Sequence, residues 1–431
     1  MAHLDRRTLL LGSAGLVLAG CGGGGSEKKA AVRATSKGPN IVKPRTGNLV
    51  SQADTAALRD RLNAAFATRD VEQLVGVIEP GDFALDDVRA RWTRRYDNFD
   101  RLGFIEGEWY VGAPAGRTRN GAGGQVEYDG DLVFAHTVAG CDAQQVVESY
   151  RATFRKTSED APLELLHIGD ADSSFDPSIW DVAEIDAIET DHARIVFRGK
   201  DASRAKAFAS RIEAGAAKAF DIMPRPQGVD KVFYALTWPQ VDGRLYGGVA
   251  VGEADAHAYY HPFLDPSELA TGQRVPTDTA GLPKATGRVG LHEGTFSRSD
   301  FVDVACHEAV HVLANQWFVN SPPIWAVEGL AQWSEGRRYL TAARGRMQAA
   351  FPQFEKVVFQ GYDEFHQSSL ETEFYLCSAA MYACIEDDDG LDAVMRTAQA
   401  FYGSTSPEKA EEKLGRTQKQ LVADTRKWLG A

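Results

Sequence analysis

The sequence predicts an α+β protein in which a targeting segment precedes two folded units. The first unit is predicted because helical periodicity over residues 51–103 gives way to short alternating runs with Gly-rich turns. The second is predicted because a strand, helix, strand order after residue 176 leads into apolar helical patterns. A chain of 431 residues with 44% hydrophobic and 25% charged residues can bury sizeable cores, so disorder is not expected.

The first 20 residues have the pattern of an export signal. A twin arginine, Arg6-Arg7, precedes an apolar run over 8–20, which is shorter than a membrane span of about 20 residues. The DRRTLL stretch resembles a twin-arginine signal, and the LAGC stretch resembles a bacterial lipobox. This resemblance implies that the chain is cleaved before Cys21 and that this cysteine carries a lipid. An N-terminal anchor helix that is never cleaved is the alternative.

Residues 21–47 are predicted to be the lipidated cysteine and a flexible basic linker. Residues 22–47 hold six Lys/Arg and one Glu without apolar periodicity, whereas the whole chain carries a net charge of -13. A basic tether beside an acidic body suits an anionic lipid surface, and the equal alternative is that the lysines only keep the tether soluble. We expect a lipid-anchored protein on the extracytoplasmic face of a bacterial cell envelope, in the periplasm or at the cell surface. The acidic balance argues against nucleic acid as a partner.

Residues 48–175 are predicted to form the first α+β unit. Helices are expected over 51–75, with a break near Arg69-Asp70, and over 82–103. Strands are expected in three runs, 104–113, 124–128 and 131–139. The stretch RWTRRYDNFDRLGFIEGEWYVG resembles the NTF2-like (cystatin-like) domains found ahead of bacterial extracytoplasmic peptidases. Such domains bind small ligands, dimerise or act as spacers, and the residues here do not select among these roles.

Residues 176–431 are predicted to form the second unit, with the boundary in the turn-rich stretch ADSSFDPSIWD. A helix is expected over 202–222, because Pro224 and Pro226 follow it. The strands expected here are 183–190, 193–197, 231–237 and 245–251.

The candidate metal site begins with the stretch CHEAVH on a predicted buried helix. His307 and His311 are separated by one helical turn, so their imidazoles project from one face and can reach a single ion. Glu308 points about 100° away from His307, where it can contact a water on the metal without being a ligand. The pattern therefore predicts two metal ligands and a candidate general base.

A third ligand is expected on the next helix, within PPIWAVEGLAQWSE over 322–335. Glu328 stands among apolar residues there, and an unpaired carboxylate in a buried helix is costly unless a cation accompanies it. Catalytic zinc takes three protein ligands and leaves the fourth position for water. His307, His311 and Glu328 are thus the predicted ligands of one Zn2+ per chain.

HEAVH followed by a Glu in an EGLA helix resembles the gluzincin metallopeptidases, particularly the bacterial peptidase MA-like group. The apolar helical stretch over 374–401 resembles the helical C-terminal part of that group. The resemblance implies a zincin-type metallopeptidase domain, with Glu308 as general base and a tyrosine that stabilises the oxyanion. Tyr375 is the candidate for that tyrosine.

One position departs from the family pattern. The family has an Asp four residues after the third ligand, whereas this chain has Gln332. The carboxylate that usually orients a ligand histidine must then come from elsewhere, and Asp303 and Glu335 are the candidates.

The predicted function is hydrolysis of peptide bonds in a peptide or protein substrate by a membrane-anchored zinc metallopeptidase. The alternative is a surface lipoprotein with a binding or scaffold role, whose zinc site is structural or inactive. Other candidates carry less weight: His292 is expected at the surface, and His257 and His261 in a turn or in core packing. Four cysteines, Cys141, Cys306, Cys377 and Cys384, are expected to be buried thiols, with a disulfide from Cys306 left open. The oligomeric state is left open.

Overall fold

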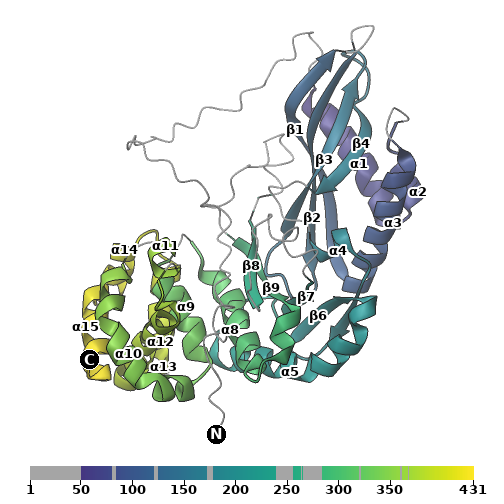
Figure 1. Cartoon of the computed structure of the whole chain (residues 1–431). Helices are drawn as coiled ribbons and strands as arrows, with labels where there is room; N and C mark the ends of the chain where they lie inside the picture. The colour runs from purple at the N-terminus through teal and green to yellow at the C-terminus, as the bar shows by residue number, and fades with distance from the viewer. Residues whose placement is uncertain are drawn as a thin grey trace.

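The protein is described from a computed structural model, which combines an N-terminal sheet, a second sheet and a helical C-terminal part in one mixed α+β architecture (Figure 1). Within the described part of the chain, no helix is long and apolar enough to cross a membrane. The signal segment, the tether and the strand predicted over 245–251 lie outside the described residues. The structure describes residues 50–79, 84–120, 125–171, 178–238, 256–263, 265, 284–319, 322–359, 362–366 and 368–431.

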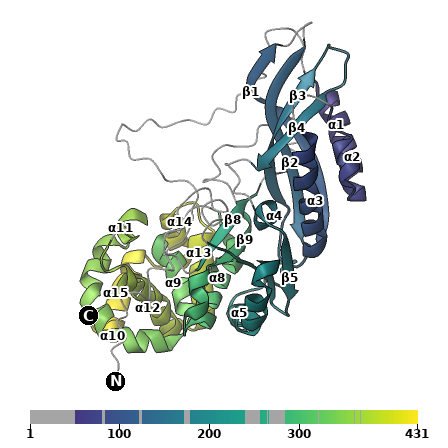
Figure 2. The same ribbon diagram turned by 45° about the vertical axis from the view of Figure 1, so that its right-hand side comes forward.

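The N-terminal sheet is an antiparallel meander in sequence order, with three helices along one face (Figure 2). The helices confirm the predicted break: Arg69 ends the first in a left-handed conformation, and Asp70 caps the next. These helices are α1 (Gln52–Thr68), α2 (Val71–Val75) and α3 (Leu85–Leu102). The strands are β1 (Phe104–Asn120), β2 (Val126–Val138), β3 (Val146–Lys156) and β4 (Glu164–Ala171).

The strand prediction for this sheet was wrong in three respects. Strand β1 continues to Asn120 instead of ending at residue 113, β3 and β4 were not predicted, and two predicted runs are one strand. The two runs predicted over 124–128 and 131–139 form the single strand β2, and Gly130 between them pairs with Ala152 on β3. Pairing on both sides outweighs the local turn preference of the Asp-Gly-Asp stretch.

The second sheet has the strand order β5-β6-β7-β9-β8, with the first and last strands antiparallel to their neighbours. Helices α5 (Ala202–Ile222) and α8 (Phe301–Ala314) pack together on one face. The short helix α4 (Ile179–Val182) leads into the sheet from the N-terminal unit. The strands are β5 (Ile185–Glu189), β6 (Ala193–Arg198), β7 (Val232–Leu236), β8 (Ala256–Pro262) and β9 (Lys284–Leu291). Single 3-10 turns are η3 (Gly199–Asp201), η4 (Glu293–Ser297) and η5 (Asn315–Trp317).

The two faces of this second sheet belong to different cores. Tyr234 and Val289 pack in the core that contains α5, α8 and the C-terminal helices. Val196 and Phe233 point the other way, into the core of the N-terminal unit, where Trp180 also packs. The second sheet therefore lies between the helices that carry the candidate site and the N-terminal unit.

The C-terminal part is a group of helices around α12, whose residues 374–385 are all buried. Helix α9 crosses α12 at Gly329, where a Cβ would lie 2.7 Å from the carbonyl oxygen of Ser378. A glycine at this position thus allows α9 to approach closely. The helices are α9 (Ile324–Ser334), α10 (Arg337–Val357), α11 (Tyr362–His366), α12 (Glu371–Asp389), α13 (Leu391–Tyr402), α14 (Pro407–Leu414) and α15 (Gln418–Leu429).

Candidate metal centre

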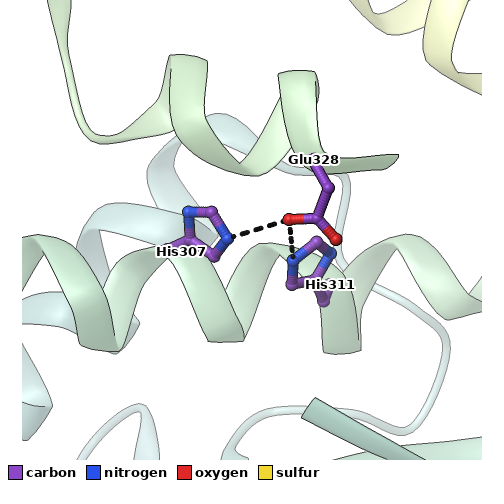
Figure 3. Close-up of side chains that lie close together, drawn as sticks. All are labelled: His307, His311 and Glu328. Carbon is purple, nitrogen blue, oxygen red and sulfur yellow. Dashed lines mark ion pairs between the residues drawn. The ribbon is translucent and has the colours of Figure 1, made fainter. Parts of the chain in front are cut away.

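Helices α8 and α9 bring the three predicted ligands together. The Nε2 atoms of His307 and His311 each lie 3.5 Å from the same carboxylate oxygen, Oε2 of Glu328 (Figure 3). One ligand atom from each residue lies within 4.8 Å of the others. The three residues form a group that could hold a metal ion, as the spacing predicts.

The spacing and burial of these atoms fit a cation. Two ligand atoms about 2.1 Å from one ion, at a tetrahedral angle, are separated by about 3.4 Å. His307, His311 and Glu328 are only 1%, 2% and 0% exposed. Nevertheless, within the described chain, Nε2 of His307 and both carboxylate oxygens of Glu328 make no hydrogen bond. Buried polar atoms without partners are costly, and a metal ion would supply the missing partner.

His307 is oriented by a carboxylate on its other side. Its Nδ1 lies 2.9 Å from Oε1 of Glu335, which follows the end of α9. A proton on Nδ1 then binds this carboxylate and leaves the lone pair of Nε2 directed at Glu328 and the ion. Glu335 is thus the carboxylate that orients His307, one of the two candidates that the sequence offered. The buried Gln332 has no hydrogen bond to its Oε1 in this part of the structure.

Asp303 has a different set of partners. Its Oδ1 accepts a hydrogen bond from Nζ of Lys218 on α5 at 2.8 Å, and its Oδ2 accepts one from the hydroxyl of Tyr339 at 2.7 Å. The same Nζ donates to the backbone oxygen of Glu335 at 2.9 Å. Asp303 therefore supports the backbone at Glu335 and does not orient the histidine itself.

The electrostatics of the cluster also require positive charge. Burial lowers the pKa of His307, but the carboxylates of Glu328 and Glu335 outweigh burial and raise this pKa to about 10. Burial raises the pKa of Glu328, but His311 and His307 outweigh it and hold this pKa at about 2. Without metal the cluster thus retains a proton, and a metal cation can take the place of that proton.

Glu308 lies beside the ligands without belonging to them. It is 2% exposed and lies close to the backbone of Ala258 on β8. Burial raises its pKa, while the charges of His307 and His311 act in the opposite direction. Its Oε1 has no hydrogen-bond partner among the described groups, so this oxygen can accept a proton.

Two tyrosines that the sequence did not single out lie near the ligands. The hydroxyl of Tyr260 on β8 donates to the backbone oxygen of His311 at 3.3 Å, and burial followed by the charges of Glu328 and Glu308 raises its pKa. Burial raises the pKa of Tyr402 on α13, and the charge of Glu328 contributes further. The sequence feature that could have indicated Tyr260 is its place in HAYYHPF, between the two histidines.

The remaining candidate residues Tyr375, His257 and His261 are buried and pack against other side chains of the fold. Tyr375 on α12 packs against the rings of Phe365 and His366, with centroid distances of 5.6 and 5.9 Å. His257 and His261 are buried on β8, which agrees with the expected core packing. The four described cysteines are free and buried, as expected, and Cys306 lies 3.6 Å from the hydroxyl of Ser334.

No protein-family model matches the chain, and no curated protein matches it. What the site can do is therefore argued from its own geometry.

Proposed function

We propose that this protein is a zinc metallopeptidase of the gluzincin type, similar to the peptidase MA-like group. The observation that carries the proposal is the single oxygen of Glu328 at 3.5 Å from both histidine Nε2 atoms. Two imidazoles and a carboxylate are a donor set that suits Zn2+. The second sheet with α8 against it is consistent with a zincin-type domain, and the helices packed on an antiparallel sheet are consistent with an NTF2-like one.

In this proposal His307, His311 and Glu328 hold the zinc, and Glu335 keeps His307 in the ligating tautomer. Bound zinc would lower the pKa of water towards about 7 and polarise a carbonyl group. Glu308, whose Oε1 has no hydrogen-bond partner among the described groups, accepts the proton of the attacking water and passes it to the leaving amine. Tyr375, predicted from the family, and Tyr260, which contacts His311, are the tyrosines to compare for stabilising the oxyanion.

The position of strand β8 supports the proposal that the substrate is a peptide. This strand is the last strand of the second sheet as described, and it packs against α8, which carries the proposed base. The outer edge of a strand can pair with an extended peptide. A peptide bound there would place its carbonyl groups close to Glu308.

One observation favours the alternative of a binding or scaffold lipoprotein with a structural zinc. The three ligands are almost completely buried, whereas a catalytic zinc needs a fourth position that water and substrate can reach. Cleavage of a peptide library by the full chain separates the two functions. We expect cleavage that a chelator abolishes and added zinc restores. A zinc-loaded chain that cleaves no peptide would favour the binding role.

The lipid anchor at Cys21 is part of the same proposal and rests on the sequence alone. Expressed in a bacterium, the chain should fractionate with the membrane, and Cys21→Ala should release it. Equal fractionation of both forms would contradict lipidation at this residue.

A further inference from the structure

Strand β8 connects the candidate site with the N-terminal unit, because its side chains alternate between the two. Ala258 and Tyr260 pack in the core that contains α8, and the hydroxyl of Tyr260 donates to the backbone oxygen of His311. Tyr259 packs against the core of the N-terminal unit. At Gly287 of the neighbouring strand, a Cβ would lie 3.1 Å from the backbone of Val312, so α8 lies directly on this part of the sheet.

Behind β8, a buried ion pair joins the second sheet to the N-terminal unit. Arg288 on β9 is paired in register with Tyr259 of β8. Its Nη2 lies 3.2 and 3.3 Å from the two oxygens of Asp142, in the turn after β2. Both side chains are 0% exposed, and the guanidinium lies 4.8 Å from the ring centres of Trp180 and Phe233.

A second group of buried charges lies beside the same strand. Glu148 on β3 accepts hydrogen bonds from Tyr150 at 2.7 Å and Ser178 at 2.8 Å, and Nε2 of His136 lies 3.2 Å away. His261 on β8 faces this group: burial and Arg288 lower its pKa, while the charge of Glu148 acts in the opposite direction. Arg288 on β9 and His261 on β8 therefore each face a buried carboxylate of the N-terminal unit.

Buried ion pairs contribute little net stability, because desolvation offsets their attraction, but they penalise arrangements in which a charge loses its partner. We propose that Asp142 and Glu148 are positioning residues of the catalytic site. They fix β9 and β8 on the N-terminal unit, and through the contact of Tyr260 with His311 they fix β8 against the helix that carries Glu308. The inference rests on the proposed function, since it makes the N-terminal unit a part of the peptidase site.

The test uses Asp142→Asn and Glu148→Gln in the full chain, each of which removes a charge and keeps the shape. Hydrogen exchange of the peptide covering β8 reports its fixation without any need for activity. The control is Asp54→Asn, which removes the carboxylate paired with the buried Lys156 at the other end of β3. Zinc content, kcat and KM are measured on the same samples.

Asp142, Glu148 and Arg288 form the junction between the N-terminal unit and the second sheet. In the two junction variants, Asp142→Asn and Glu148→Gln, we expect faster hydrogen exchange in β8 and a roughly tenfold lower kcat. KM should stay within about twofold, and the zinc content should not change. The control should change none of these. Unchanged exchange in β8 for both junction variants, or an equal increase in the control, would overturn the inference. If no form cleaves peptides, the proposed function fails, and the exchange data still decide whether the junction fixes β8. If Asp142→Asn does not fold, the milder Glu148→Gln decides the question.

Discussion

Two buried glutamates in this protein have the same depressed pKa and opposite surroundings. The pKa of Glu148 in the junction and that of Glu328 in the candidate site are both about 2, and in each case burial is outweighed by neighbouring histidines. Glu148 accepts hydrogen bonds from Tyr150 and Ser178, whereas neither oxygen of Glu328 has a hydrogen-bond partner in the described structure. The carboxylate of Glu148 is thus satisfied by donors of the protein itself. The carboxylate of Glu328 has no such donor among the described groups, which is why we propose a cation beside it.

Replacing Glu308 or Glu148 by glutamine should distinguish the loss of the general base from the loss of a positioning residue. The loss of the base is the largest effect we expect. Glu308→Gln should reduce hydrolysis about 10²–10⁴-fold while zinc is retained, because a general base is lost and no ligand is removed. Glu148→Gln should cost only about tenfold. Steady-state kinetics with zinc analysis of the same samples measures both. Full activity in Glu308→Gln would refute its role as the base.

The orientation of His307 gives an intermediate effect. Glu335→Gln should weaken zinc binding about 10–100-fold, as the loss of a carboxylate behind a ligand histidine usually does. Asp303→Asn should weaken it less, since Asp303 bonds Lys218 and Tyr339 rather than the imidazole. Competition with a chelator of known affinity measures both. The reverse order of the two effects would mean that the contact between Glu335 and His307 does not orient the ligand.

The smallest effect we expect is that the increase in Tm caused by bound zinc depends on pH. Because the carboxylates outweigh burial and raise the pKa of His307 from 6.5 to about 10, the metal-free fold binds a proton more tightly than the unfolded chain does. This contribution to stability is complete below pH 6.5 and is lost as the pH rises through about 10. Zinc replaces the proton, so the increase in Tm on loading should grow from pH 6.5 upwards.

Thermal unfolding of loaded and metal-free chain between pH 6.5 and about 9 measures this trend. Glu148→Gln should show the same trend, because the carboxylate it removes has no part in the ligand group. An increase in Tm that stays constant or shrinks with rising pH would contradict competition between the proton and zinc.

The candidate site was predictable because each of its signals is local. The apolar patterns around HEAVH and EGLA predict helices close to the observed α8 and α9, and a spacing of one turn places both histidines on one face. The orienting carboxylate could only be narrowed to Asp303 or Glu335. The choice depends on where α9 ends relative to α8, which is a tertiary relation.

The junction and part of the N-terminal sheet could not be predicted. Arg288 and Asp142 are separated by 146 positions, so no local pattern joins them. Strand β3 is buried on both faces along most of its length, and its side chains lack the alternation that marks a strand with one face in solvent. Strand β2 contains Gly130 within a turn-forming stretch, where long-range pairing decided the conformation.

The most direct test of the metal assignment is the zinc content of the full chain after dialysis, measured by elemental analysis beside Glu328→Gln and Glu148→Gln. Both variants neutralise a buried glutamate of equally low pKa, and only one of these glutamates belongs to the ligand group. We predict about one zinc per chain in the unmodified protein and in Glu148→Gln, and none in Glu328→Gln. Zinc retained equally by both variants, or absent from the unmodified chain, would contradict the account.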